Sequence, residues 1–475
     1  MSLSTSTFKM LLSKSANAIL FFGGITLFAR RLPSNELGVF FLYLALLGVC
    51  SIPADLGVRA ALEKRLSEGE AAAEILGSAL AFKTLTLAVV GGLLLAMGTF
   101  IDSYAHFPIT PYLVLGLVVQ EFSRFSIQTV RGELRVGETA IIEVGRRFTW
   151  VTSSFLLLEY GYGPEALLIG QIVGRSLEFV WATTRVDTSL GRPSIARVRS
   201  IVAFSKYSTI TAVGGRVYQW MDVLVIGFLL TNSHVAAYEI AWQVTLLVLL
   251  VSNSIRLNLF PQISQWDAEA ATERIQNAIS TALGYVLYVS VPAIVGAVLY
   301  ADEILRFVFG AEYTIASTVL VVLMVEKLFQ SVNDVIGISV SAIDRPDLAA
   351  KATVASVGVN LVLTPLLIVT VGFVGAAYAT MLSWLVNTIL HGRYLARHVN
   401  FEIPVRLLAW YIVSAVLMGG MLAVLNQYQP VTGVTVLFAQ VVVGMVLYLA
   451  FSIASIDVRD QVVRPAVHLL RPDAN

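Results

Sequence analysis

The sequence predicts an all-α, polytopic membrane protein of about fourteen transmembrane helices, and three observations lead to this fold class. First, 57% of the 475 residues are hydrophobic and only 13% are charged, whereas about a quarter of the residues in a soluble domain are charged. Second, apolar runs of roughly twenty residues, long enough to cross the hydrocarbon layer as helices, alternate with short polar turns. Third, an early part of the chain can be aligned with a later part, which indicates an internal repeat.

The apolar runs are expected to be helices rather than strands. Lipid offers no hydrogen-bonding partner to the backbone, and the alternation of apolar and polar residues typical of a membrane barrel is missing. The expected spans are residues 8–30, 37–55, 74–97, 110–130, 138–158, 165–184, 203–230, 235–258, 275–299, 317–340, 350–370, 374–392, 405–425 and 433–456.

The positions of lysine and arginine predict the orientation. If the N-terminus is cytoplasmic, the outer loops contain only Arg30, Arg31 and Arg306, and the inner loops collect most of the other basic residues outside the spans. Basic residues favour the cytoplasmic side of a membrane. We therefore expect a multi-pass protein of the cell (plasma) membrane with both termini in the cytoplasm, which requires an even number of spans.

Two stretches of the chain repeat each other. Leu37-Gly38-Val39-Phe40 aligns with Val235-Ala236-Ala237-Tyr238, and Gly161-Tyr162 aligns with Gly372-Phe373. Two six-helix halves in parallel repeat indicate a pseudo-twofold axis along the membrane normal, with substrate bound between the halves. The expected parts are a first six-helix bundle (1–190), a second six-helix bundle (199–392), two additional transmembrane helices (404–457) and a cytoplasmic tail (458–475).

Six short motifs follow one another along the chain. They are Ala29-Arg30-Arg31-Leu32-Pro33 with Gly38-Val39-Phe40, Asp55-Leu56-Gly57, Phe260-Pro261-Gln262-Ile263-Ser264, Phe309-Gly310-Ala311-Glu312-Tyr313, Asn360-Leu361-Val362-Leu363 and Gly372-Phe373-Val374-Gly375-Ala376-Ala377. In order and spacing they resemble the oligosaccharide-lipid flippases of the polysaccharide transporter group, whose superfamily includes multidrug exporters and the lipid II flippase. The chain departs from that pattern at Gly163-Pro164-Glu165-Ala166, where the family often has Gly-x-x-Gly-Ala-Ala. The resemblance implies two six-helix bundles flanking a cavity, with two peripheral helices.

Charged residues inside the expected spans are candidate site residues, because each costs about 3 kcal/mol at a helix centre on insertion scales and needs a partner or water. Three sets have a spacing that puts opposite charges on one helical face. The spacing leaves open whether the charges of each set only neutralise each other or also belong to a functional site. The sets are Glu121 with Arg124, Glu143 with Arg146 and Arg147, and Arg175 with Glu178.

Two basic residues lack such a neighbour. Arg216 is expected about 15 Å along its helix from Lys206, near the bilayer midplane. Lys83 is similarly deep in the third expected span, with no acidic residue three or four positions away. Both are candidates for a substrate cavity, and an interhelical ion pair is the alternative for each.

Two more arginines and two carboxylates complete the candidates. The repeat places Arg59 and Arg256 at nearly equivalent cytoplasmic helix ends, where they either capture an anionic head group or act only as topology determinants. Asp222 and Asp334 are candidates for coupling transport to a proton or sodium gradient. The five histidines are scattered and the one cysteine has no partner, so neither a metal site nor a cofactor is expected.

The resemblance implies a flippase that moves a polyprenol-linked oligosaccharide from the cytoplasmic to the outer leaflet by alternating access. Arginine suits its phosphate because the guanidinium donates paired hydrogen bonds, and lysine supplies a point charge. The substrate-binding candidates are therefore Arg59, Lys83, Arg124, Arg146, Arg147, Arg216 and Arg256. The implied partners are a polyprenyl (pyro)phosphate-linked glycan, membrane lipid and glycan-assembly enzymes. A net charge of +1 argues against nucleic acid.

Two other functions compete with this one. A cation-coupled small-molecule (drug) antiporter of the same fold would favour carboxylates in its cavity, yet the first expected span has no aspartate or glutamate. A membrane enzyme acting on lipid-linked sugars would need a catalytic domain, for which the outer loops are too short. We therefore do not expect an enzyme.

Overall fold

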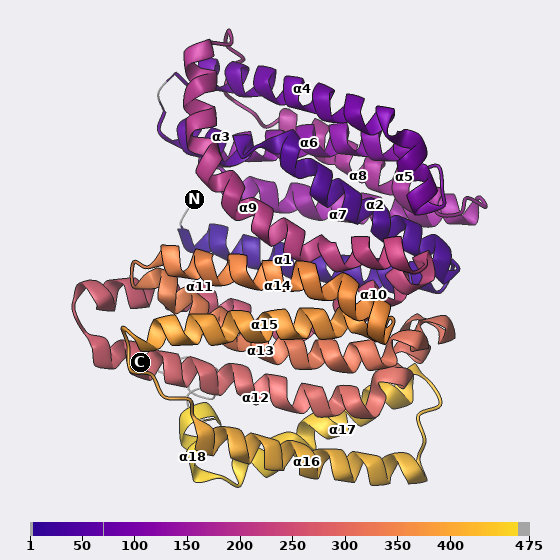
Figure 1. Cartoon of the computed structure of the whole chain (residues 1–475), viewed down its shortest axis with the longest axis vertical. Coiled ribbons are helices and arrows are strands. Elements are labelled where there is room, and N and C mark those ends of the chain that lie inside the picture. The colour runs from indigo at the N-terminus through magenta and orange to yellow at the C-terminus, as the bar shows by residue number, and fades with distance from the viewer. Residues whose placement is uncertain (1–2, 70, 464–475) are drawn as a thin grey trace. The chain divides into compact units, whose positions relative to one another are not determined.

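The computed structural model describes residues 3–69 and 71–463, without the side chains of residues 3–12, 14, 204–218, 462 and 463. Every regular element within these residues is a helix (Figure 1), which confirms the all-α class. Every predicted span overlaps a helix, and 8 segments of the described chain are long and apolar enough to cross a membrane. The chain is thus a multi-pass membrane protein, while the count of about fourteen spans stays a prediction.

The chain divides into two compact units, Met1–Ala236 and Ala237–Asn475. The helices of the first unit are α1 (Leu3–Ala29), α2 (Ser34–Asp55), α3 (Val58–Ser67), α4 (Ala72–Ala96), α5 (Gly98–Ala105), α6 (Thr110–Gly132), α7 (Val136–Glu159), α8 (Glu165–Thr183), α9 (Ile195–Leu229) and the start of α10 (Asn232–Thr245).

The second unit continues from α10. Its elements are η1 (Leu246–Val248), α11 (Leu249–Ala268), α12 (Thr272–Ile304), η2 (Leu305–Phe309), η3 (Ala311–Ala316), α13 (Ser317–Ala342), α14 (Pro346–Val371), α15 (Val374–Ala396), α16 (Val405–Tyr428), α17 (Val434–Ile453), α18 (Ile456–Val458) and η4 (Arg459–Val463).

Helix α9 packs with the first unit, although the sequence repeat assigns it to the second bundle. It contacts α2, α3 and α4, and the Tyr104 hydroxyl of α5 donates a hydrogen bond of 2.7 Å to the Leu224 carbonyl. Gly227 faces Leu42 so closely that an added Cβ would lie 2.6 Å from its side chain. The division into a first bundle at 1–190 and a second at 199–392 is based on the sequence repeat alone, and it stays a prediction.

The segment between α8 and α9 is fixed across one end of the first unit. Gly191 donates its backbone N–H to the Ala73 carbonyl at 2.9 Å. The carboxylate of Glu133, in the turn after α6, accepts the backbone N–H of Thr188 at 2.8 Å. Hydrogen bonds to two separate elements hold this connection in one path.

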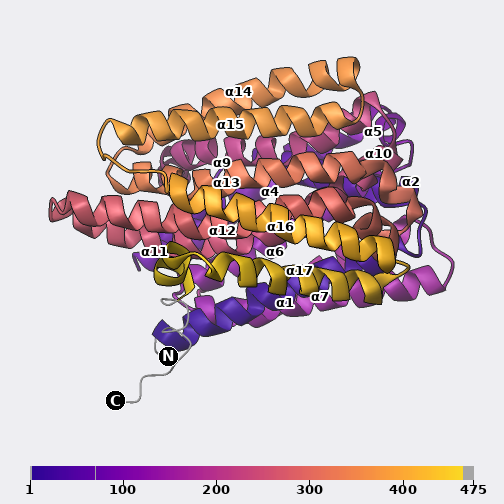
Figure 2. The ribbon, with the colours of Figure 1, turned by 90° about the horizontal axis from the view of Figure 1, so that it is seen from below.

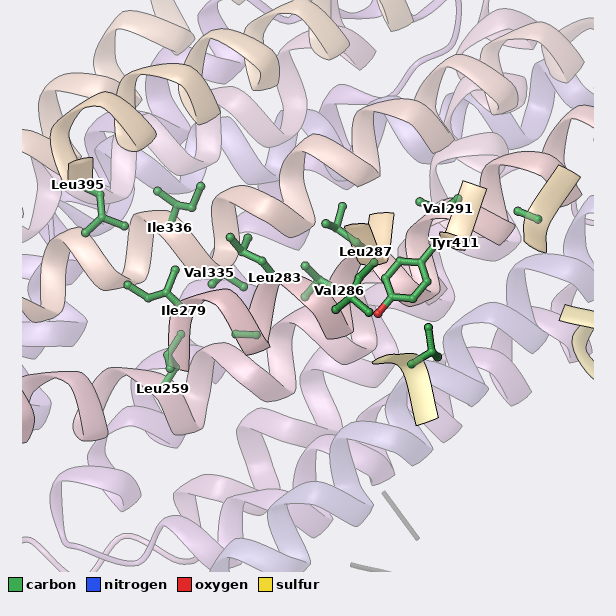
Figure 3. Close-up of a cluster of buried hydrophobic side chains, with 14 of the residues drawn as sticks. Leu259, Ile279, Leu283, Val286, Leu287, Val291, Val335, Ile336, Leu395 and Tyr411 are labelled. Atoms are coloured by element: carbon green, nitrogen blue, oxygen red, sulfur yellow. The ribbon is translucent and has the colours of Figure 1, made fainter. Parts of the chain in front are cut away.

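An apolar core unites the helices of the second unit (Figure 3). Leu283 and Val286 of α12, Val335 of α13, Leu395 of α15 and Tyr411 of α16 belong to one apolar cluster, and all five side chains are almost fully buried. Inside a bilayer, such contacts stabilise mainly through van der Waals packing, because lipid tails are as apolar as the side chains.

The C-terminal helices α16 and α17 lie side by side and pack on α12 (Figure 1, Figure 2). The Tyr448 hydroxyl of α17 donates to the Tyr288 carbonyl at 3.0 Å, and the Tyr300 hydroxyl of α12 donates to the Gln440 side chain at 2.7 Å. These bonds satisfy polar atoms that would be costly in lipid. The helices beyond the sequence repeat are thus attached to the second unit by aromatic and polar contacts.

The glycine-rich motif after α14 has a steric cause. Gly372 has φ +85°, a left-handed conformation that glycine adopts without steric cost. At Gly375, an added Cβ would lie 2.1 Å from the Leu367 carbonyl oxygen. The motif thus allows α15 to turn back and pack tightly along α14.

Candidate functional site

A sharp turn places the first charged side chain of the site. Helix α2 ends at Asp55, and Leu56 and Gly57 have φ values of 45° and 75° before α3 begins. Glycine takes up the second of these without strain. The turn brings Arg59 back over the end of α2, where its Nε lies 2.9 Å from Asp55 Oδ1.

Lys83 of α4 lies between two carboxylates from two other helices. Its ammonium is 2.6 Å from Asp55 Oδ1 and 2.5 Å from Glu121 Oε2 of α6, and its side chain is 0% exposed. Of the two roles that the sequence leaves open for Lys83, the interhelical ion pair is the one observed.

Glu121 also approaches Arg124, one turn further along α6, at 3.6 Å. Positive and negative groups therefore alternate along one buried chain of contacts. The side chains at its two ends, Arg59 and Arg124, are 19% and 23% exposed. We call this set the α2–α4–α6 network: Arg59, Asp55, Lys83, Glu121 and Arg124.

A second buried carboxylate gathers charges from α7 and α8. Glu178 accepts a hydrogen bond from Arg146 Nε at 3.0 Å and from Arg175 at 2.6 Å. The Ser123 hydroxyl of α6 also donates to Glu178. We call this set the Glu178 cluster: Ser123, Arg146, Arg175 and Glu178. Because Ser123 and Glu121 share α6, this helix takes part in both sets.

Arg147 is held by aromatic rings. Its guanidinium carbon lies 4.5 Å from the ring centroid of Phe21 and 5.2 Å from that of Trp150. Such cation–π contacts stabilise a desolvated cation by about 2 kcal/mol. The side chain is thus tied to α1 and to its own helix.

Two of the three predicted intrahelical sets form. Arg124 lies 3.6 Å from Glu121, and Arg175 lies 2.6 Å from Glu178. The third set does not form as predicted, because Glu143 pairs with Arg131 of α6 at 2.6 Å and Arg146 turns to Glu178. Glu143 and Arg146 thus each pair with a residue of a neighbouring helix instead of with each other.

The remaining candidates belong to other helices. Arg216 falls on α9, but its side chain lies outside the described part of the structure. Asp222 is buried on the same helix. In the second unit, Asp334 of α13 accepts a hydrogen bond from Ser252 at 2.8 Å, and Arg256 of α11 is exposed. The pairing of Arg256 with Arg59 and the coupling roles of both aspartates stay predictions.

Several members of the site escape reasoning from the sequence. Asp55 stands 28 residues from Lys83, and Ser123 stands 55 residues from Glu178. The available signal for Asp55 is its place before Gly57, in a motif that marks a helix end. In the second unit, Lys327 lies 3.4 Å from the Trp242 ring centroid, a contact that the sequence does not indicate.

The charges of the site favour an anion. The ion pairs of the α2–α4–α6 network and the Glu178 cluster join five basic side chains to the three carboxylates of Asp55, Glu121 and Glu178. Guanidinium groups donate paired hydrogen bonds that match phosphate oxygens. Within residues 3–69 and 71–463, no group of three or more histidine, cysteine or acidic side chains is placed to hold a metal ion.

Comparison with known proteins identifies related sequences. The family described as polysaccharide biosynthesis protein matches residues 27–318. The probable low-salt glycan biosynthesis flippase of Haloferax volcanii is 39% identical over 470 residues, which are 99% of this chain and 100% of the relative. The probable flippase AglR of the same organism is 29% identical over 84% of this chain and 85% of its own length.

Solved structures share the fold. The inward closed conformation of the lipid II flippase MurJ has a TM-score of 0.80 at 17% identity, covering 95% of this chain and 99% of that one. The Vibrio cholerae MATE transporter VcmN has a TM-score of 0.56 at 12% identity, covering 84% and 98%. At these identities the likeness is one of architecture, and it extends over the first and second units alike.

Proposed function

Since the chain belongs to the family of polysaccharide biosynthesis proteins, we propose that it is a flippase for a polyprenol-linked oligosaccharide. It carries this substrate from the cytoplasmic to the outer leaflet by alternating access. The observation behind the proposal is the 39% identity, over 99% of the chain, to a relative named as a glycan biosynthesis flippase. The fold shared with the lipid II flippase supports the same class of movement.

The charges of the first unit supply the chemistry for the lipid-linked head group. A polyprenyl phosphate or pyrophosphate is anionic, and Arg59 and Arg124 are the partly exposed ends of the α2–α4–α6 network. Each is paired with a carboxylate, and a guanidinium carries five N–H donors in a planar fork that matches phosphate oxygens. Lys83 and Arg146 are more deeply buried. Lys83 pairs with Asp55 and Glu121, and Arg146 pairs with Glu178.

The same proposal sets the location and the partners. The chain lies in the plasma membrane with both termini in the cytoplasm, because basic residues concentrate in the loops on that side. Its substrate is made by glycan-assembly enzymes, which deliver it at the cytoplasmic leaflet. Moving a lipid head group across the bilayer requires no covalent bond to change, so the chain acts as a transporter and not as an enzyme.

Transport in vesicles tests the proposal. The purified chain is reconstituted with a fluorescent polyprenyl phosphate oligosaccharide in one leaflet, and arrival in the other leaflet is followed by an external quencher. Vesicles with the chain are expected to equilibrate the probe faster than vesicles without protein. Arg124→Gln is expected to slow this movement, while Arg397→Gln, an exposed change at the end of α15, leaves it unchanged.

The antiporter alternative predicts a different result. A carrier of cationic drugs would move a lipophilic cation against a proton or sodium gradient and would ignore the lipid-linked glycan. The excess of basic over acidic partners in the described network favours an anionic substrate. Gradient-driven cation movement without glycan movement would refute the flippase assignment.

A further inference from the structure

A groove lies between α11 and α12 in the second unit. Its volume is about 570 Å³. The two helices are joined by a short turn and run antiparallel, so residues near the turn on one helix face residues near the turn on the other. The floor of the groove is apolar and includes Ile255, Leu259, Ala278 and Ala282.

The walls of the groove are polar. Asn258 and Gln262 of α11 and Asn277 of α12 line it, and all three are exposed. Asn258 donates to the Ser254 carbonyl at 3.0 Å, which leaves its amide oxygen directed elsewhere. In the part of the chain that the structure describes, the side-chain amides of Gln262 and Asn277 form no hydrogen bond. Their donors and acceptors are therefore available to a ligand.

Two aromatic side chains and one cation also line the groove. Trp266 and Arg274 stand on either side of the turn, and Tyr285 lies further along α12. The Tyr285 hydroxyl donates to the Gln461 carbonyl at 3.2 Å, which fixes the ring. Arg274 is loosely paired, 3.7 Å from Glu269 and 67% exposed.

The composition of these walls differs from that of a lipid-facing surface. On α14, the exposed side chains include Val354, Leu361, Val362 and Val369. Lipid cannot satisfy the hydrogen-bonding groups of an amide, so exposed amides indicate a polar neighbour. Water alone satisfies amides at a membrane boundary, but it does not explain the apolar floor and the aromatic rings beside them.

We propose that the groove between α11 and α12 binds a neutral sugar ring of the lipid-linked oligosaccharide, an inference that rests on the flippase function proposed above. A pyranose has one face of C–H groups and an edge of hydroxyls. The C–H face fits the apolar floor and the ring of Trp266. Each hydroxyl both donates and accepts, as does each amide, so Gln262 and Asn277 match the edge of the ring.

The position of the groove fits an early step of transport. It follows the predicted cytoplasmic end of α11 and the start of α12, on the side where the glycan is assembled. Binding a sugar there places the glycan beside the second unit, while its phosphate is left for basic side chains elsewhere. The groove thus recognises the part of the substrate that distinguishes it from bare polyprenyl phosphate.

Binding to the purified full chain tests this inference. The probes are a polyprenyl phosphate that carries one hexose and the same polyprenyl phosphate without sugar. Gln262→Met and Asn277→Leu remove the amides at nearly constant volume. Each is expected to weaken binding of the hexose probe about five-fold, and the double variant about twenty-five-fold, because each loses one hydrogen bond. Binding of the sugar-free probe is expected to stay unchanged.

Gln265→Met is the matched control, because Gln265 lies on the same helix outside the groove and bonds to Glu269. Equal weakening of both probes, no weakening of either, or the same loss in the control would overturn the inference. Transport by the wild-type chain is measured in parallel. If the wild type binds the hexose probe through the two amides but does not move it, the flippase function fails while the sugar site stands.

Discussion

Replacing Lys83 with methionine tests the central contact of the α2–α4–α6 network. Methionine has a similar length but no charge, so the change removes the cation and keeps most of the packing. In the wild type, the ammonium lies 2.6 Å from Asp55 and 2.5 Å from Glu121, and the lysine side chain is 0% exposed. The variant therefore leaves two buried carboxylates facing each other without their shared partner.

The expected loss of stability follows from these contacts. Breaking a buried ion pair by removing one partner costs about 3–5 kcal/mol. Asp55 keeps Arg59 at 2.9 Å and Glu121 keeps Arg124 at 3.6 Å. Because both carboxylates retain one cation, we expect a value near the lower limit, about 3 kcal/mol.

The single cysteine of the chain provides the assay. Cys50 is half-buried on α2, within two turns of Asp55. Its reaction with a maleimide reports local opening of this helix, and a loss of about 3 kcal/mol raises the labelling rate by about 150-fold when opening and closing are fast relative to labelling. Lys351→Met is the control, because its exposed pair with Asp347 at 3.6 Å contributes little.

The double variant decides between charge and shape. Lys83→Met with Glu121→Gln removes one of the two carboxylates that the single change leaves facing each other, so part of the stability is expected to return. Wild-type labelling in Lys83→Met would show that the buried ion pairs do not stabilise the first unit. Faster labelling in the double variant than in the single would mean that Glu121 stabilises the first unit through Arg124, and that repulsion between the two carboxylates is not the cost of losing Lys83.

Three further changes test separate parts of the fold and site. Gly38→Ala is expected to destabilise the first unit by about 3 kcal/mol, seen as faster cysteine labelling, because its Cβ would lie 1.9 Å from the Asn232 carbonyl oxygen. Arg59→Gln is expected to slow glycan-lipid transport about ten-fold while surface expression is kept, because Arg59 is a partly exposed end of the α2–α4–α6 network and Asp55 keeps Lys83 as a partner. Reporter fusions after Gln429 and after Ser455 are expected to label opposite faces of the membrane, because α17 lies between them.

Each of these has a matched comparison. Gly92→Ala on α4 places its Cβ in open space and is expected to leave stability unchanged or raised by about 0.5–1 kcal/mol, so equal damage from both glycine changes would contradict the steric argument. Arg406→Gln removes an exposed arginine that is paired with Asp457 at 3.0 Å, and it is expected not to affect transport. Fusions that report on the same face would remove α17 from the set of spans.

Periodicity and composition predict the helices because the bilayer leaves the backbone few choices. Apolar length alone places α2, α4, α16 and α17 within a few residues of their observed bounds. Local spacing likewise predicts the pairing of Arg175 with Glu178, since both groups lie on one face of one helix. Properties set within a single helix are therefore readable from the sequence.

Contacts between helices are not readable in this way. The pairing of Glu143 with Arg131 rather than with Arg146 depends on how α6 and α7 pack, which no spacing along one helix specifies. The partners of Lys83 come from α2 and α6, and only the packed bundle brings them together. The sequence shows that such a lysine needs a partner, and the tertiary structure determines which one it has.

The charges of the first unit also bear on the difference between the 8 apolar segments and the predicted count of about fourteen spans. Helices α6, α7 and α8 are not among the 8 segments that are apolar enough to cross a membrane. These helices carry the buried residues Glu121, Arg146 and Glu178, and each of the three pairs with a charge on another helix. A charge is costly in lipid only while it is unpaired or faces the tails, so a helix whose charges face its neighbours can remain in the bilayer. The residues that lower the hydropathy of α6, α7 and α8 are thus the ones that bind these helices to each other. A span of this kind is stable only within the assembled bundle, which makes the ion pairs a condition of the fold as well as the source of a cationic site.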